Sequence, residues 1–170
     1  MKKYSLIAFI ALAAVSFQAF GQKLEENKKD DFTGKLIKRT SWEQLCWSNS
    51  NGHCRFSLVG DSEFLDLKLM IDKVFSIDKD QDLLLKLANG EIVTLKSQDY
   101  QNACLGCGAT GLIGKQAEGL QTSYLITPEQ VAKLKANKIV EVRIQTTEGY
   151  IDDNVKDKYA GKVIALLNLL

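Results

Sequence analysis

Four cysteines and a single histidine are the residues of this chain with the most distinctive chemistry. Cys46 and Cys54 flank a turn segment that contains Asn-Gly, whereas Cys104 and Cys107 form a Cys-x-x-Cys sequence. Four cysteines in an oxidising compartment indicate two disulfides, and three connectivities are possible. We favour the two local pairings, Cys46 with Cys54 and Cys104 with Cys107, because the crossed pairings require two distant regions to be adjacent in space. The sequence leaves the crossed pairings open.

Cys104 and Cys107 could instead form a redox-active dithiol, which is a more specific function than a structural disulfide. Such a pair needs one stabilised thiolate, which commonly lies at a helix amino-terminus. Here Gly106 and Gly108 occupy the positions where that helix would begin, and the preceding residues 97–103 are polar, unlike a buried strand. The pattern therefore favours a structural bridge. A periplasmic thiol-disulfide oxidoreductase that uses Cys104 and Cys107 stays as the alternative.

His53 could join the four thiols as a zinc ligand. The chain has only one Cys-x-x-Cys knuckle, and an exported protein favours disulfides over zinc thiolates. Residues 78–82 begin like a calcium-binding loop, but Leu83 stands where that loop needs glycine and Asn89 where it needs glutamate. We therefore expect no metal site. The single histidine also leaves a small hydrolase without a nominated base unless His53 itself serves.

The stretch 103–119 holds five of the twelve glycines of the chain. Its letters from Gly106 to Gly111 fit the dinucleotide pattern, but that pattern works only between a buried strand and a helix, and neither flank fits. We therefore expect no cofactor. Tight surface loops often carry binding function, so Gly106, Gly108, Gly111 and Gly114 are the candidate binding residues.

The amino-terminal composition predicts export. Lys2 and Lys3 precede a largely apolar run, and small residues lie at the two positions that a signal peptidase reads, which predicts a signal peptide over residues 1–21. Residues 22–31 are rich in mixed charges and predict a flexible leader. Residues 32–170 are then a single domain of ordinary size.

Charge and hydropathy narrow the choice of partners. The chain has 22 basic and 21 acidic residues, and it shows no basic stripe interleaved with aromatic residues. Nucleic acid is therefore excluded as an expected partner. We also expect no membrane span once the signal peptide is removed, and a periplasmic or secreted location. The expected partner is an unknown protein or another ligand of the cell envelope.

Periodicity predicts a run of strands followed by helix, strand and helix. The Leu83–Leu95 segment alternates around Asn89-Gly90 and predicts a hairpin, while Thr127 followed by Pro128 predicts a helix start. The remaining expected elements are strands near 32–41, 55–59, 65–71, 75–77, 124–126 and 140–144, an ambiguous segment at 42–47, and a terminal helix capped by Asp153 or Asn154. We therefore predict an α+β fold in which an antiparallel β-meander precedes a helix-strand-helix unit packed on one sheet face.

Four short motifs carry a resemblance that spans most of the chain. They are Thr40-Ser-Trp-Glu43, Asn89-Gly-Glu-Ile-Val-Thr-Leu95, Thr127-Pro-Glu-Gln130 and Gly149-Tyr150. In these motifs the chain resembles small secreted proteins of unknown function from Bacteroidetes. The resemblance implies export and a compact sheet-plus-helix domain, and it implies no reaction. Together with the residues above, it leads us to expect an exported, non-enzymatic binding or structural module.

Overall fold

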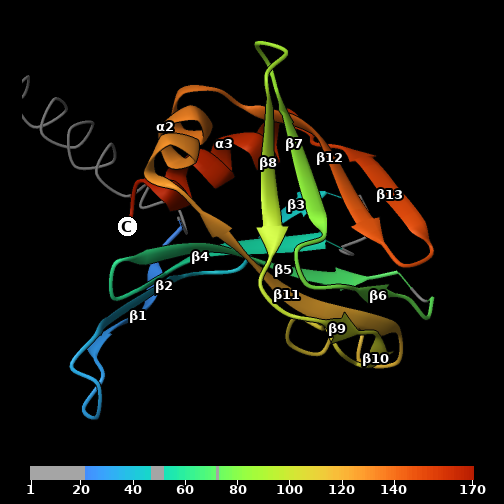
Figure 1. The fold of residues 1–170 in the computed structure, drawn as a ribbon, viewed down its shortest axis with the longest axis horizontal. Helices are drawn as coiled ribbons and strands as arrows, with labels where there is room; N and C mark the ends of the chain where they lie inside the picture. Colours follow the sequence, from blue (N-terminus) through green and yellow to red (C-terminus); the bar gives the residue numbers. More distant parts are fainter. Residues whose placement is uncertain (1–21, 47–51, 72) are drawn as a thin grey trace, which may run out of the picture.

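The computed structural model of the protein describes residues 22–46, 52–71 and 73–170, so the predicted signal peptide lies outside the described residues. The described chain is built from β-strands and two short helices (Figure 1). The strands are β1 Leu24–Lys29, β2 Leu36–Thr40, β3 Glu43–Cys46, β4 Gly52–Val59, β5 Ser62–Met70, β6 Ser76–Ile77, β7 Asp82–Leu87, β8 Ile92–Ser97, β9 Gln101–Asn102, β10 Cys104–Leu105, β11 Glu118–Ile126, β12 Ile139–Thr146 and β13 Gly149–Asn154. The helices are α2 Pro128–Ala136 and α3 Asp157–Leu167.

One large antiparallel sheet dominates the molecule. Its strand order is β1-β2-β4-β5-β11-β8-β7-β12-β13, with β3 paired to β4 and β10 paired to β11, which makes 11 strands within the described residues. Strands β6 and β9 form a separate small sheet. The predicted α+β arrangement is therefore wrong. The strands that follow the glycine-rich loop and helix α2 belong to the same sheet as the earlier strands, and they do not form a helix-strand-helix layer on its face.

Strand β11 is the element that breaks the predicted meander. It pairs with β5 from Gly119 to Ile126 and with β8 at Tyr124 and Leu125, so a strand from late in the chain lies between β5 and the β7–β8 hairpin. Its core face is formed by Leu120, Thr122, Tyr124 and Ile126, which are buried. Alternation was visible in sequence only at Tyr124 and Ile126, because a polar threonine interrupts the apolar series.

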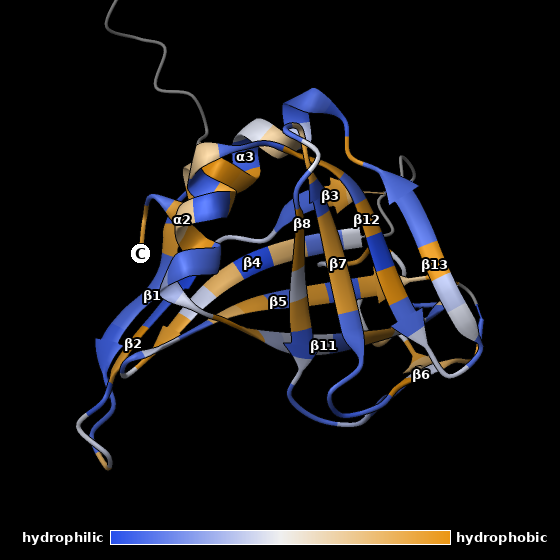
Figure 2. Ribbon diagram, turned by 45° about the horizontal axis from the view of Figure 1, so that its top comes forward, coloured by the Kyte–Doolittle hydropathy of each residue, from blue (hydrophilic) through white to orange (hydrophobic). Residues whose placement is uncertain are grey.

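The sheet is sharply twisted where β11 meets β8. Only two residue pairs, Tyr124 with Ser97 and Leu125 with Lys96, join these strands. In Figure 1 strands β7, β8 and β12 run across the direction of β4, β5 and β11. The core fills the angle between the two halves, and α3 closes it by packing against β3, β4 and β12. Apolar and polar bands alternate along β12, as expected for a strand with one buried face (Figure 2).

Two local predictions are confirmed in detail. The β7–β8 hairpin turns at Asn89-Gly90, where Gly90 has φ +86°, a conformation that favours glycine. Helix α2 begins with a capping box: the Gln130 backbone N–H donates to Thr127 Oγ1 at 3.3 Å, and the Thr127 N–H donates to Gln130 Oε1 at 2.9 Å. Both features depend on neighbouring residues alone.

The chain termini of the domain differ from the predictions. Residues 153 and 154, expected to cap the terminal helix, belong to β13 and pair with Val142 and Glu141, and α3 starts only at Asp157. The segment expected as a flexible leader contains β1, which pairs with β2, and Glu26 forms an ion pair with Arg39 there. The ambiguous segment at 42–47 forms strand β3 at Glu43–Cys46. In each case the neighbouring strand supplies backbone partners that local sequence does not reveal.

Candidate functional site

The glycine-rich stretch is a long hairpin connection between β10 and β11. Cys104 pairs with Gly119 and Leu105 with Glu118, so the two ends of the loop are joined by a short ladder. The loop is also attached to β5, because Lys68 Nζ donates to the Ala109 carbonyl oxygen at 3.3 Å. The glycine-rich loop is therefore attached to the sheet both at its base and at Ala109.

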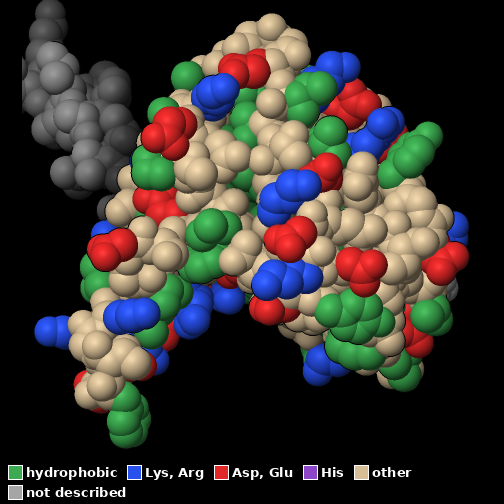
Figure 3. Space-filling model, in the orientation of Figure 1, with side chains coloured by type: hydrophobic (Ala, Val, Ile, Leu, Met, Phe, Trp, Pro, Cys, Tyr) green, Lys and Arg blue, Asp and Glu red, His purple; other side chains and the backbone are tan. Residues whose placement is uncertain are grey.

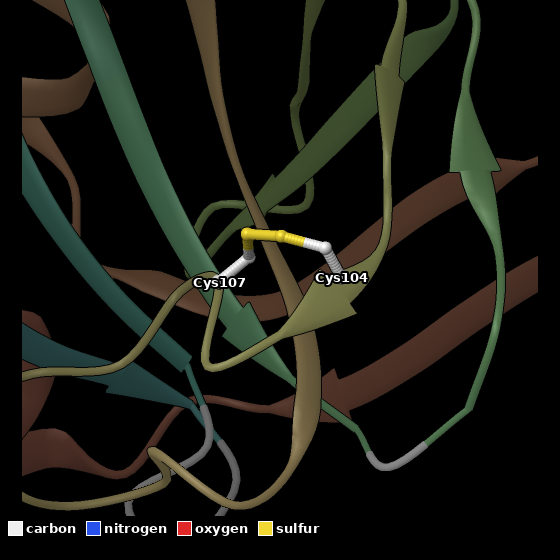
Figure 4. The surroundings of a disulfide bond; sticks show 2 residues. All are labelled: Cys104 and Cys107. Atoms are coloured by element: carbon white, nitrogen blue, oxygen red, sulfur yellow. A yellow bond between two sulfur atoms is a disulfide. The ribbon is translucent and has the colours of Figure 1, made fainter.

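A disulfide between Cys104 and Cys107 closes the first turn of this loop (Figure 4). Their Cα atoms are 5.2 Å apart, which is within the usual range for a disulfide. The Cys107 backbone N–H donates to the Cys104 carbonyl oxygen at 3.1 Å, so the bridged segment is a hydrogen-bonded turn. Cys104 is exposed and Cys107 is half-buried. This is the local pairing that the spacing favoured.

The glycines of the loop are needed mainly for close packing. A Cβ atom on Gly108, which has φ +76°, would lie 2.3 Å from the Leu69 carbonyl oxygen. A Cβ atom on Gly114 would collide with the side chain of Met70. Of the four predicted binding glycines, Gly111 is the one whose Cβ would meet no atom within 4 Å. Gly108 and Gly114 thus hold the loop against β5, and their role as ligand contacts stays a prediction.

Three apolar side chains of the loop are exposed, next to the exposed polar residues Lys115 and Gln116. Leu112 is 83% exposed, Leu105 is 64% exposed and Ile113 is 58% exposed. An isolated bridge between Thr110 and Ile113 shapes the tip that carries two of these three side chains. In Figure 3 hydrophobic side chains gather at the end of the molecule that carries β6, β9 and β10. Sequence reasoning noted the glycines and missed these neighbours, although apolar residues within a turn-rich segment were the available signal.

An open groove lies next to the base of the loop. It has a volume of about 590 Å³, and its wall includes Val74 and Tyr150, which are 71% and 65% exposed. The Ala103 N–H donates to the Phe75 carbonyl oxygen at 2.9 Å, so the groove wall and the loop are directly connected. The Arg143 guanidinium lies 4.3 Å from the centre of the Tyr150 ring. We call the loop 103–119, residues 73–75 and the β12–β13 turn the apolar end.

The second cysteine pair has a different environment. Cys46 and Cys54 are free thiols that are almost fully buried, so the predicted bridge between them is not formed. The strand register explains this result, since Cys46 lies opposite Gly52 and Cys54 lies opposite Glu43. Burial raises the pKa of the Cys54 thiol to about 12. Burial also raises the pKa of Cys46 well above its ordinary value, with smaller contributions from Asp153 and Cys54.

His53 does not join the thiols in a metal site. It is next to Cys54 on β4, so strand alternation directs the two side chains to opposite faces of the sheet. Burial, and secondarily the charge of Lys68, lowers the pKa of His53. Across residues 22–46, 52–71 and 73–170, no group of three or more His, Cys, Asp or Glu side chains could hold a metal ion.

Comparisons of the chain with family models, with curated proteins and with solved structures find no match. The resemblance to secreted Bacteroidetes proteins therefore stays a prediction. Within the described ranges, no helix has both the length and the apolar composition that a membrane span requires.

Proposed function

We propose that the protein is an exported, non-enzymatic binding module of the cell envelope whose contact surface is the apolar end. The observation that carries this proposal is the exposure of Leu105, Leu112 and Ile113 on a loop that is bound to the sheet. Soluble domains rarely expose a contiguous apolar surface without a partner for it. The disulfide and the packed glycines reduce the entropy that the loop would lose on binding.

The expected partner is a protein. The apolar end combines a projecting loop tip with a concave groove, and a protein surface can fill the groove while contacting the tip. Strand β13 forms the edge of the sheet beside this groove, so an extended segment of a partner could also pair with its backbone. Periplasmic or secreted location is part of the proposal, supported by the sequence of residues 1–21 and by the Cys104–Cys107 bond.

A site-specific crosslink tests this proposal. Replacing Leu112 with a photo-reactive phenylalanine derivative in the producing cell should give one discrete adduct with another protein. The same replacement at Ile92, an exposed residue of β8 outside the apolar end, is the matched control and should give no such adduct. Adding Val74→Ser and Tyr150→Ser should greatly weaken the adduct at position 112. Equal adducts at both positions, or none at position 112, would contradict the proposal.

The alternative is a periplasmic thiol-disulfide oxidoreductase, and the exposure of Cys104 is the observation in its favour. Stabilisation of a thiolate by a helix amino-terminus is lacking, because the two helices of the described chain begin at Pro128 and Asp157. We expect insulin reduction by the protein to equal that of the Cys104→Ser/Cys107→Ser variant. Turnover that is lost in this variant would establish the alternative instead.

A further inference from the structure

A second surface with site-like features lies on the outer face of β2, β4, β5 and β11, and its lining shares no residue with the apolar end. Here a hollow of about 470 Å³ adjoins a second one of about 320 Å³, and the two share Asp99, Gln121 and Ser123 in their walls. Both volumes fall in the range of about 300–1,000 Å³ that is typical of small-molecule sites. Together they form a continuous polar groove.

The floor of this polar groove is a buried ion pair with additional hydrogen bonds. Asp66 on β5 is only 5% exposed, and its carboxylate accepts from Arg55 Nε at 2.8 Å, Ser57 Oγ at 2.7 Å and Ser123 Oγ at 2.6 Å. The strand register places Arg55, Asp66 and Ser123 side by side across β4, β5 and β11. The Arg55 guanidinium carbon also lies 4.5 Å from the centre of the Trp42 ring. These contacts hold the polar atoms of the floor in fixed positions.

The rim of the polar groove carries polar side chains that are free to bind a ligand. Among the described residues, the side chains of Gln121 and Asp99 form no hydrogen bond or ion pair, and both are exposed in the groove wall. Gln121 shares its strand face with Ser123 two residues later, so its amide projects beside the fixed floor. The Gln121 amide can both donate to and accept from adjacent hydroxyl groups, and the Asp99 carboxylate can accept from them.

Charge balance in the groove narrows the ligand class. Arg39 and Arg55 provide two positive charges, and Asp66 and Asp99 provide two negative ones, so the lining has no net charge. Outside the lining, Glu26 forms ion pairs with both Arg39 and Lys28, so Glu26 and Lys28 together add no net charge. The groove therefore has no excess charge that would attract an anion or a cation. An apolar ligand would cover the polar side chains of the lining and leave them without hydrogen-bond partners. Phe64 supplies one apolar wall, which suits the C–H face of a sugar ring.

We propose that this polar groove binds a neutral oligosaccharide, with Gln121 and Asp99 contacting its hydroxyl groups over the Arg55–Asp66 floor. The groove and the apolar end share no lining residue, so a protein partner there and a glycan here can be tested with separate variants. The direct test titrates the purified protein with neutral cellotriose, mannotriose and maltotriose, and with anionic trigalacturonate, while backbone amide chemical shifts are recorded. One neutral trisaccharide should saturate and shift the amides of residue 99 and residues 121–123.

Two variants test whether the amide chemical-shift changes arise from sugar bound in the polar groove. Gln121→Ala should weaken binding by about tenfold, the effect of losing one or two hydrogen bonds, with an unchanged melting temperature. Gln145→Ala on the exposed face of β12 is the matched control and should leave binding unchanged. The proposal is overturned if no neutral trisaccharide causes saturable shifts, if trigalacturonate binds more tightly than all three, or if Gln121→Ala binds like the control.

Discussion

The two cysteine pairs of this protein use the same residue type in opposite ways. Cys104 and Cys107 are three positions apart in a glycine-rich loop near the surface, and they form a disulfide. Cys46 and Cys54 are on adjacent strands inside the core, and they remain free thiols. Short sequence separation therefore does not by itself produce a bridge. The bridge forms where a turn brings the two Cα atoms together, whereas strand register places the other pair at offset positions.

The pairs also differ in what they contribute to the fold. The buried thiols act as small apolar side chains within the cluster that includes Leu45 and Phe56. The disulfide restrains the beginning of a loop whose tip is exposed. Only Cys104 and Cys107 lie at the surface that we propose for binding. Three measurements test this contrast: the reactivity of the thiols, the stability of loop glycine variants, and the stability of a variant without the disulfide.

The largest expected difference is in thiol reactivity. A pKa raised from 9.0 to about 12 lowers the thiolate fraction of Cys54 at neutral pH about a thousandfold. After mild reduction of the native protein, Cys104 and Cys107 should therefore be alkylated rapidly and Cys46 and Cys54 only on unfolding. Peptide mapping by mass spectrometry measures this. Unreduced, denatured protein should release two reactive thiols, and a result of zero would show that Cys46 and Cys54 are both in disulfides after all.

Disrupting the packing of the loop against β5 is expected to have the next largest effect, which is a loss of stability. Gly108→Ala should lower the free energy of unfolding by about 3 kcal/mol, because the new Cβ meets the Leu69 carbonyl oxygen and the backbone has positive φ. Gly111→Ala is the matched control, since it has a similar φ of +62° and open space, and should cost about 1 kcal/mol. Denaturant unfolding compares them. Equal losses at the two positions would show that contact with β5 does not hold the loop in place.

Removal of the bridge is expected to have the smallest effect of the three. The Cys104→Ser/Cys107→Ser variant should lose about 2 kcal/mol of stability, because a disulfide across so short a loop restricts the unfolded chain only modestly. Denaturant unfolding of oxidised and variant protein checks this value. If the variant instead loses its global fold, the disulfide would be a requirement for the core and not a local restraint, and the contrast between the two pairs would fail.

Several elements could be predicted from sequence because their causes are local. The Asn89-Gly90 turn and the Thr127 capping box depend on residues within four positions of each other, and both are present. The buried face of β5 was likewise visible as alternating leucines. Exposed apolar residues such as Leu112 were overlooked, because sequence periodicity does not distinguish a surface loop residue from a core residue when the surrounding glycines obscure the pattern.

What the sequence by itself determined were the turns, the helix cap and the alternating faces of individual strands, since these arise from backbone preferences and side-chain periodicity. Only the tertiary structure decided that β11 separates β5 from β8, that Asp66 meets Arg55 and Ser123, and that Cys46 and Cys54 stay apart. These features depend on which strands are neighbours and in what register. Pairing between strands far apart in the chain leaves almost no local signature, because any strand with a suitable buried face can serve as the partner.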